Sequence, residues 1–391
     1  MATENLNNVL NLSCKEFFQE LDIDKSLKKV GLILAGGTGE KFWPLSNKKK
    51  SEHFVHLIGD STLFQKTYSL ISKQIDKDNI YIVSNCQFRS FIQDQISIKE
   101  ENIINEPLMR QTAPALCLFL TLVEDKYDDN DIICVFPSDQ FINRSVDFNF
   151  SINIACQAAA KLDALITIGV DPVEPNSHYG YIQYIEDITD IKNNKINETL
   201  YKNGVRKSIN FVEKPDLETA QRFINSGGFV WNCGILVSKK KILVQTLKNT
   251  LKYHYDKFQY IKTLINTEKY WPELENLYKT FNNISIDYGI LEKADNIYVV
   301  KSTFNWNDLN DWKDLHSISL KDAMNNVFHG DIIAIDTTDS LVISNQKPIA
   351  IFGMDDIVAI DTADAILICK KSQSHRLKDL VKHIQKLNIP I

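Results

Sequence analysis

The residues best suited to chemistry form a glycine-rich segment, LAGGTGEKFWPLS, at residues 34–46. The chain has only 14 glycines among 391 residues, which is about half the usual share, yet Gly36, Gly37 and Gly39 lie within four residues. Glycines that follow a strand let the backbone turn tightly and leave amide groups free to face an anion. The segment contains neither the GK[ST] of a P-loop nor the GxGxxG of a dinucleotide-binding fold. We therefore predict an anion-binding loop of a different kind.

Two aspartates and one arginine are further candidates. Asp139 in FPSDQ directly follows an apolar run, where α/β sheets place functional side chains. Asp308 in FNWNDL comes 169 residues later, and Arg110 is one of only six arginines. Taken alone, each aspartate is more often a helix cap or a turn former, and Arg110 could be a surface residue. The residue types by themselves leave these alternatives open.

The elements that would position these residues follow from the hydrophobic pattern. Near-continuous apolar runs predict buried strands at 30–37, 79–84, 131–137, 164–170 and 234–238, with helices such as 63–75 and 113–125 between them. Strands that alternate with helices of this length predict βαβ units and a mostly parallel sheet. The alternation in HYGYIQYIED, within 178–215, predicts antiparallel strands over a site, and 240–282 is predicted helical.

The character of the sequence changes near residue 326, where short β runs alternate with polar turns. This spacing predicts a small β-solenoid or sandwich. A final helix would place apolar side chains on one face, which suggests a dimer contact: Leu377, Leu380, Val381, Ile384 and Leu387. We predict a helical extension at 1–28, a main domain at 29–325 and a small β domain with a C-terminal helix at 326–391.

Composition excludes several classes of protein. The net charge of −6, with no dense basic stripe, argues against a nucleic-acid binder. The longest apolar stretch, Ala113–Val123, is too short to span a bilayer, and the N-terminus lacks a signal-peptide pattern, so we expect no membrane partner. Seven scattered cysteines without a CxxC pair indicate buried thiols in a reducing compartment. A cytoplasmic location is therefore expected.

The glycine-rich segment resembles LAGGxGxRLWPLS, the signature of sugar nucleotidyltransferases in the mannose-1-phosphate guanylyltransferase branch. The resemblance covers about residues 29–391 and continues through further blocks in the family's order: FVHLIGDSTLFQKT (54–67), EPLMRQTAPA (106–115), FPSDQFI (136–142), YGYI (179–182), FVEKPD (211–216), WNCGI (231–235), SIDYGILEKAD (285–295) and FNWNDLNDW (304–312). It implies an α/β fold: a Rossmann-like nucleotidyltransferase domain with a mixed, mostly parallel sheet, followed by a short left-handed β-helix and a C-terminal helix.

The resemblance also implies an activity, the transfer of GMP from GTP to mannose 1-phosphate, which gives GDP-mannose and diphosphate. A homodimer is a further expectation. The family assigns the nucleotide to Leu34, Ala35, Gly36, Gly37, Gly39, Arg110 and Thr112, and the sugar phosphate to Tyr179, Gly180, Glu213, Lys214 and Asn232. Lys41, Asp139 and Asp308 would be catalytic, and the two aspartates would hold Mg²⁺.

The departures from the family pattern fall in this site. Lys41 replaces an arginine, and Glu52 stands where the family's PKQF has its phosphate-contacting lysine. Gln140 replaces the histidine of PSDH, Gln111 the asparagine of RNTAPA, and Asn310 the glycine of WxDVG. Two alternatives to an ordinary active enzyme follow: a catalytically weak or inactive regulatory or binding protein, or a nucleotidyltransferase for another sugar or base. One of the lysines 48–50 could also replace the missing cation.

Overall fold

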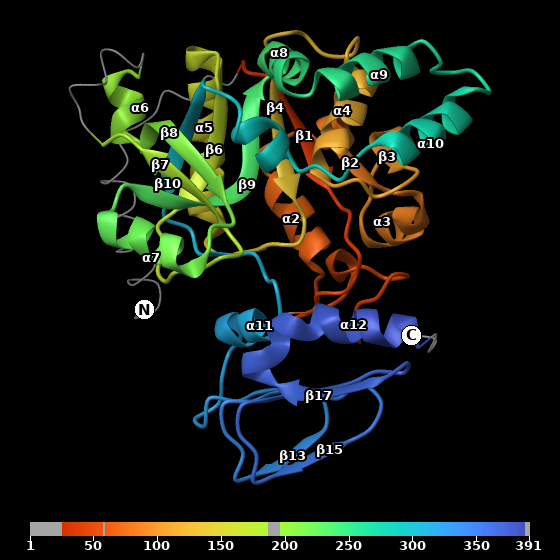
Figure 1. Cartoon of the computed structure of the whole chain (residues 1–391), viewed down its shortest axis with the longest axis vertical. Coiled ribbons are helices and arrows are strands. Elements are labelled where there is room, and N and C mark those ends of the chain that lie inside the picture. The colour runs from red at the N-terminus through yellow and green to blue at the C-terminus, as the bar shows by residue number, and fades with distance from the viewer. Residues whose placement is uncertain (1–25, 58, 187–195, 388–391) are drawn as a thin grey trace, which may run out of the picture.

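The computed structural model describes residues 26–57, 59–186 and 196–387. It consists of a large body, a sheet with helices on both faces, and a small body of short strands beneath it (Figure 1). The predicted N-terminal extension lies outside the described residues except for its last three positions. The predicted boundary at 325/326 stays a prediction; it falls in the link between the two bodies.

The large sheet has nine strands within the described residues, in the order β3-β2-β1-β4-β9-β6-β10-β8-β7. Their bounds are β1 Lys29–Leu34, β2 Ile80–Asn85, β3 Ile103–Glu106, β4 Ile132–Pro137, β6 Leu165–Val170, β7 Gly180–Tyr184, β8 Val205–Glu213, β9 Phe229–Lys239 and β10 Ile297–Ser302. Only β8 and β9 run against the direction of the others. The mixed, mostly parallel sheet is therefore confirmed, as are the antiparallel strands predicted within 178–215.

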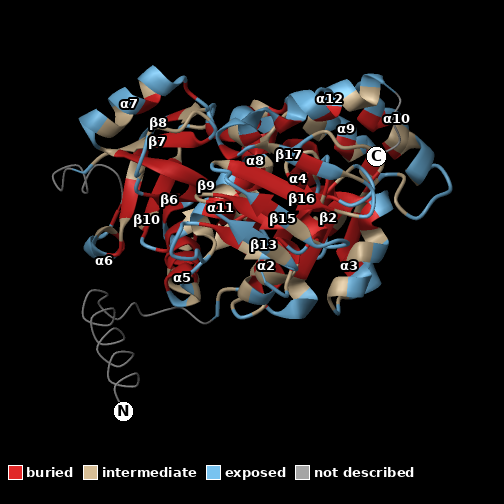
Figure 2. Cartoon of the chain, turned by 90° about the horizontal axis from the view of Figure 1, so that it is seen from below, coloured by how far each residue is buried: buried red, intermediate tan, exposed pale blue. Residues whose placement is uncertain are grey.

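The central strands are apolar on both faces because helices cover both faces (Figure 2). In β1, for example, Val30, Leu32 and Ile33 are fully buried. One face packs against α2 Leu63–Ile71, α3 Arg89–Gln95, α5 Ser145–Leu162, α6 Glu198–Lys202 and α7 Leu217–Ser226. The other packs against α4 Thr112–Val123, α8 Lys240–Thr250, α9 Lys252–Lys262 and α10 Tyr270–Thr280. No helix in the described parts of the chain is both long and apolar enough to cross a membrane.

The small body has the stacked parallel pairings of a β-helix. Strands β12 Val327–His329, β14 Leu341–Ile343 and β16 Ile357–Asp361 pair in parallel, β17 Ile366–Lys370 adds antiparallel to β16, and β13 Ile332–Ile335 pairs with β15 Ile349–Phe352. Strands β14, β15 and β16 thus pair in parallel with β12, β13 and β14, respectively, as in successive coils of a solenoid. Of the two architectures predicted from the sequence, a β-solenoid or a sandwich, the structure has the solenoid.

One apolar cluster joins the two bodies. Trp312, at the start of α11 Trp312–Ile318, is fully buried, stacks edge-on against Phe42 at 5.1 Å, and donates from Nε1 to the carbonyl of Trp43. Strands β12, β14, β16 and β17 and the C-terminal helix α12 Leu377–Lys386 contribute to the same cluster. The loop that follows β1 is therefore held from below by the small body.

Helix α12 uses its apolar face within the chain. Leu377 and Val381 are buried in the apolar cluster that joins the two bodies, whereas Leu380 and Leu387 are 41% and 58% exposed. The five apolar residues predicted on one face thus divide between an internal contact and solvent.

Candidate active site

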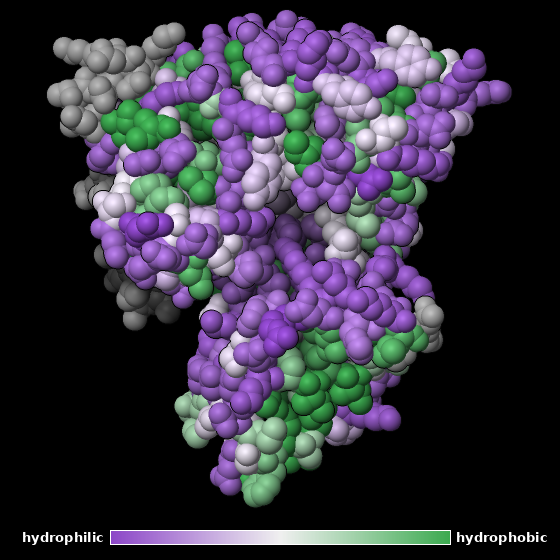
Figure 3. Space-filling view, viewed as in Figure 1, coloured by the Kyte–Doolittle hydropathy of each residue, from purple (hydrophilic) through white to green (hydrophobic). Residues whose placement is uncertain are grey.

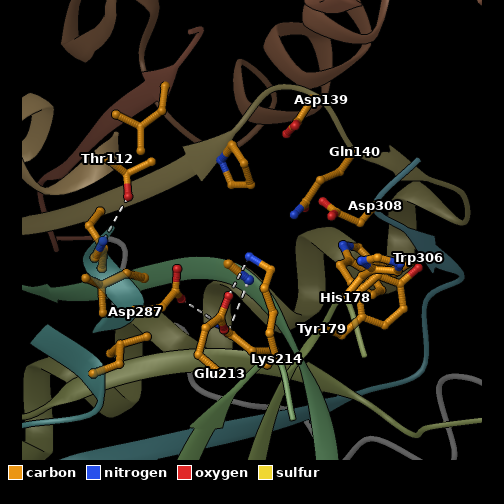
Figure 4. A pocket seen from close by; sticks show the side chains of 18 residues that line it. Thr112, Asp139, Gln140, His178, Tyr179, Glu213, Lys214, Asp287, Trp306 and Asp308 are labelled. Atoms are coloured by element: carbon orange, nitrogen blue, oxygen red, sulfur yellow. Dashed lines mark hydrogen bonds and ion pairs between the residues drawn. The ribbon is translucent and has the colours of Figure 1, made fainter. Parts of the chain in front are cut away.

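A cleft opens where β1 and β4 end, at the carboxyl edge of the parallel strands. This is where α/β proteins bind their ligands. The cleft holds about 750 Å³ of empty space including its open mouth, and side chains reach it from the parallel strands, the antiparallel strands and the C-terminal end of the large body (Figure 4). It is lined by Leu34, Thr112, Pro137, Asp139, Gln140, His178, Tyr179, Gly180, Glu213, Lys214, Asn232, Gly234, Leu236, Ile286, Asp287, Leu291, Trp306 and Asp308.

Most of the predicted site residues lie on this cleft. They are Leu34, Thr112, Asp139, Tyr179, Gly180, Glu213, Lys214, Asn232 and Asp308. Lys41 is connected to it through Asp139. Ala35, Gly36, Gly37, Gly39 and Arg110 do not line it.

A two-stranded ribbon brings the two predicted metal-binding aspartates together. Strand β5 (Phe141–Ile142) pairs antiparallel with β11 (Trp306–Asn307), with Asn307 opposite Phe141. Extending this register by one residue places Asp308 opposite Gln140, beside Asp139. The pairing explains how two residues 169 positions apart point into one cleft (Figure 4).

Lys41 balances the charge of these aspartates. Its Nζ lies 2.9 Å from Asp139 Oδ2. Burial disfavours the ammonium, but the carboxylates of Asp139, Asp308 and Glu52 raise the pKa of Lys41 well above its usual value. Burial also opposes ionisation of Asp139, yet mainly Lys41 lowers the pKa of that carboxyl to about 2. Burial, reinforced by the charge of Asp139, raises the pKa of Asp308 to about 6.

A second polar group occupies the opposite wall, on β8 and β9. Lys214 Nζ lies 2.9 Å from Glu213 Oε1, and Asn232 Nδ2 donates to Asp287 Oδ1 at 2.9 Å. The hydroxyl of Thr167 donates to Asn232 Oδ1 and fixes the orientation of that amide. Burial and the nearby charge of Asp287 raise the pKa of Glu213 to about 7. This wall can accept hydrogen bonds from hydroxyl groups and offers one cation.

Some residues of the glycine-rich loop make contacts within the fold that the sequence did not predict. The amide of Ala35 donates to the carbonyl of Val83, so it extends the sheet and does not face the cleft. Gly39 is buried with φ at +72°, and a Cβ there would lie 2.0 Å from the carbonyl oxygen of Asn47. Gly36 is exposed and has open space around it. Nucleotide binding by this loop, predicted for Leu34, Ala35, Gly36, Gly37 and Gly39, stays a prediction.

Arg110 and Thr112 stand at the start of α4 and contact the segment that crosses over them. Arg110 Nε donates to the carbonyl of Tyr278 at 2.8 Å, and Thr112 Oγ1 accepts from the amide of Ile286 at 2.8 Å. Both contacts position the chain around residues 278–286. A role of either residue toward a base stays a prediction.

Position 52 holds a buried carboxylate. Glu52 is 3% exposed and accepts a hydrogen bond from the Ser51 hydroxyl, and its charge acts on Lys41. Residues 48–50, the predicted substitute cations, are exposed in a turn and do not line the cleft. The departure from the family pattern therefore adds a negative charge beside the aspartates.

Comparison with known proteins identifies the class of this cleft. The sequence matches the family described as nucleotidyl transferase over residues 30–325 and the MannoseP isomerase/GMP-like beta-helix domain over residues 330–384. The chain is a member of the nucleotidyl transferase family. Both the fold class and the recognition made from sequence motifs are confirmed.

Individual relatives agree with the family match. This nucleotidyl transferase is 29% identical to a mannose-1-phosphate guanylyltransferase of Sinorhizobium fredii. The alignment covers 91% of this chain and 68% of that relative. It is 30% identical to the alginate biosynthesis protein AlgA of Pseudomonas aeruginosa, over 91% of this chain and 72% of that one. A crystal structure of mannose-1-phosphate geranyltransferase from Thermus thermophilus has the same fold, with a TM-score of 0.80, 24% identity and coverage of 92% and 100%.

The sequence prediction missed three polar residues that line the nucleotidyl transferase cleft, namely Gln140, His178 and Asp287. Asp287 holds Asn232 and acts on the pKa of Glu213. Gln140, noted only as a departure, donates from Nε2 to the carbonyl of Cys233, while its buried Oε1 has no hydrogen-bond partner. The block SIDYGILEKAD was the available signal for Asp287, because it placed an aspartate in a segment shared with the family.

The raised pKa of Glu213 makes a pH-dependent contribution to stability that can be measured. The fold favours its protonated form, so this contribution is present below pH 4.5 and is lost as pH rises through about 7. The Glu213→Gln variant has no such group. The difference in unfolding free energy, wild type minus variant, should fall by on the order of 3 kcal/mol between about pH 4.5 and 8 in urea denaturation. Glu218→Gln, an exposed control on α7, should show a constant difference, and a constant difference for Glu213→Gln would contradict the assignment.

Proposed function

We propose that this chain transfers GMP from GTP to mannose 1-phosphate, releasing diphosphate and forming GDP-mannose. The proposal rests on the family and on the names of its relatives at about 30% identity. The single observation in the site that carries it is the convergence of Asp139 and Asp308 on one cleft beside Lys41. Transfer of a nucleotidyl group requires its phosphates to be held and their charge to be offset, and this cluster has the groups for both tasks.

The residues present fit the Mg²⁺ that the family implies. Asp139 and Asp308 offer carboxylate oxygens, the donors that this hard cation prefers. The charge of Asp139 contributes to the raised pKa of Asp308, as expected for two carboxylates that lie close together. Gln140, whose Oε1 has no hydrogen-bond partner among the described residues, lines the same cleft. We propose that Asp139 and Asp308 hold Mg²⁺, which when bound supplies charge neutralisation for phosphate oxygens.

The opposite wall fits the sugar phosphate. Glu213 can accept hydrogen bonds from sugar hydroxyls, and Lys214 can pair with the phosphate. Tyr179 stacks edge-on between Trp231 and Trp306, with ring centroids 4.9 Å apart in both pairs, and gives this end of the cleft an apolar side. A sugar has hydroxyl edges and an apolar face, so the wall matches its chemistry.

For the reaction, the protein has to hold the mannose phosphate and GTP in the correct relative orientation. An oxygen of the mannose phosphate, oriented by Lys214, attacks the α-phosphorus of GTP in line with the leaving group. The bond from that phosphorus to the bridging oxygen of the β-phosphate breaks, and diphosphate leaves with its negative charge. We propose that Lys41 offsets the developing charge and that amides of the loop near Gly36 and Gly37 bind the triphosphate. We propose no covalent intermediate on the protein.

Buried Glu52 favours a second candidate. A carboxylate in place of the family's lysine repels a triphosphate, and the loss of a cation in phosphoryl transfer costs several orders of magnitude in rate in related systems. The second candidate is therefore a protein that binds GTP or GDP-mannose with weak or no turnover. Another sugar or base is the remaining alternative.

We also propose a cytoplasmic location and a homodimer. The six cysteines among the described residues are free thiols, which supports a reducing compartment. An apolar patch on the small body supports the dimer: side chains 57% to 71% exposed on β13, β15 and β17 are Ile333, Ile335, Phe352, Ile366 and Ile368. Figure 3 shows apolar surface over these strands. This strand patch, rather than helix α12, is the surface that we assign to the contact.

Replacing either aspartate should remove activity. We expect Asp139→Asn and Asp308→Asn each to lower Mg²⁺-dependent diphosphate release from GTP and mannose 1-phosphate by about 100-fold or more, because each removes a charged ligand. Asp364→Asn, an exposed position in the β-helix, should match the wild type. A wild type that binds GTP but releases no diphosphate would favour the second candidate, and an unchanged Asp139→Asn rate would contradict the metal assignment.

The dimer is tested by mass in solution. The wild type should sediment at twice the 44.8 kDa of one chain at micromolar concentration, and Phe352→Glu combined with Ile368→Glu should sediment as a monomer because two charges would be buried in the contact. Tyr260→Glu, on exposed α9 of the large body, is the control that should stay dimeric. A monomeric wild type would contradict the proposal.

A further inference from the structure

Three side chains of types that can ligate a metal lie close together next to Gly37 of the glycine-rich loop. One ligand atom each of Glu52, His53 and Asp139 lies within 4.8 Å of the others. Glu52 and His53 are 3% and 2% exposed. Glu52 and His53 are not among the side chains that line the main cleft, and neither belongs to the Asp139–Asp308 pair discussed above.

The hydrogen bonds of His53 fix which ring nitrogen is free. His53 Nδ1 lies 2.8 Å from the hydroxyl oxygen of Ser138, and that hydroxyl donates its single hydrogen to the carbonyl of Leu34 at 2.8 Å. The serine oxygen must therefore accept from Nδ1–H. In the neutral ring, Nε2 then carries a lone pair. This is the arrangement by which proteins orient a metal-binding histidine through its other nitrogen.

The free nitrogen has no partner in the described structure. His53 Nε2 is buried without a hydrogen bond, although a buried polar atom is costly to leave unpaired. Space is kept beside it by Gly37, because a Cβ at that position would lie 2.9 Å from Nε2 and 3.0 Å from Glu52 Oε1. The small volume in front of Gly37 is thus bordered by a nitrogen lone pair and a carboxylate oxygen.

The charge of the surroundings favours a cation there. Glu52, Asp139 and Asp308 are three carboxylates that all act on one ammonium, that of Lys41. When ionised, the four groups sum to −2, and Lys214, which also acts on Asp308, is itself paired with Glu213. A divalent ion between Glu52 and Asp139 would offset negative charge there, and it would supply positive charge close to position 52, where the family pattern has a lysine.

We propose that Glu52, His53 and Asp139 bind a divalent transition-metal ion, Mn²⁺, Co²⁺ or Zn²⁺, through Nε2 of the imidazole and one oxygen of each carboxylate. The imidazole selects these ions over Mg²⁺, which prefers oxygen ligands. Three protein ligands leave at least one coordination position open, for water or a phosphate oxygen. Ligand atoms held at about 2.1 Å from one ion lie at most about 4.2 Å apart, so binding requires the side chains to close wherever their ligand atoms are now further apart, up to 4.8 Å. Binding of the ion does not depend on the proposed function, whereas a role for it beside the triphosphate does.

Direct binding of Co²⁺ to the full chain tests the proposal. After chelator treatment, calorimetry in excess Mg²⁺ should show one Co²⁺ per chain, with the visible absorption of a protein-bound Co²⁺ ion and displacement by Zn²⁺. His53→Gln and Glu52→Gln should each weaken binding by at least about 10-fold, because each removes a direct ligand. His56→Gln, three residues away and exposed, should bind as the wild type does, and Asp308→Asn should keep a one-to-one complex.

Absorption spectroscopy at the zinc edge of the wild type gives a readout that needs no variant to fold. It should show one imidazole with oxygen ligands. No binding of Co²⁺ or Zn²⁺ by the wild type, an all-oxygen or sulfur-containing shell, or equal affinity in folded His53→Gln would overturn the site. Neither experiment uses GTP or a sugar phosphate, so failure of the metal site and failure of the proposed function are distinguishable.

Discussion

Three carboxylates surround the ammonium group of Lys41 at the carboxyl edge of the sheet, and this excess of negative charge governs the site. Lys214 also acts on one of them, Asp308, but is itself paired with Glu213. Glu52, Asp139 and Asp308 all act on Lys41, whose pKa they raise although burial opposes its charge. At an effective dielectric constant of 20, two unit charges 4 Å apart interact by about 4 kcal/mol. Folded proteins retain such unfavourable repulsion mainly at sites where it serves binding or catalysis. Here the gain we propose is the binding of cations and, through them, of a triphosphate.

The other elements of the fold position these charged side chains close together. Strands β1 and β4 are buried side by side and end at the cleft, so that the loops that follow them deliver Lys41, Glu52 and Asp139. The β5–β11 ribbon brings Asp308 from the far end of the large body. The small β-helix packs against the loop after β1 in the same apolar cluster as Trp312 and Phe42, and its packing therefore bears on a site that it does not itself line.

Much of this could be predicted from sequence because it depends on local patterns. The apolar run of β1, the glycines after it and Asp139 at the end of β4 are all readable from neighbouring residues. Asp308 could be assigned only through family resemblance, since the ribbon that places it is two residues long on each strand. The free nitrogen of His53 depends on a serine from another strand and on the carbonyl that this serine bonds. The contact of the Ala35 amide with the carbonyl of Val83 could not be predicted either, because it depends on the neighbouring strand.

The affinity of the chain for GTP, measured with and without divalent cations, shows whether the excess of carboxylates must be offset by cations. If the excess of carboxylates requires cations before a triphosphate can enter, calorimetry should show GTP binding at least about 100-fold weaker in chelator than with Mg²⁺ present, a difference of about 2.7 kcal/mol. Equal affinity for GTP in the two conditions would contradict the account, because the nucleotide would then be held without any offset to the charge of Glu52, Asp139 and Asp308.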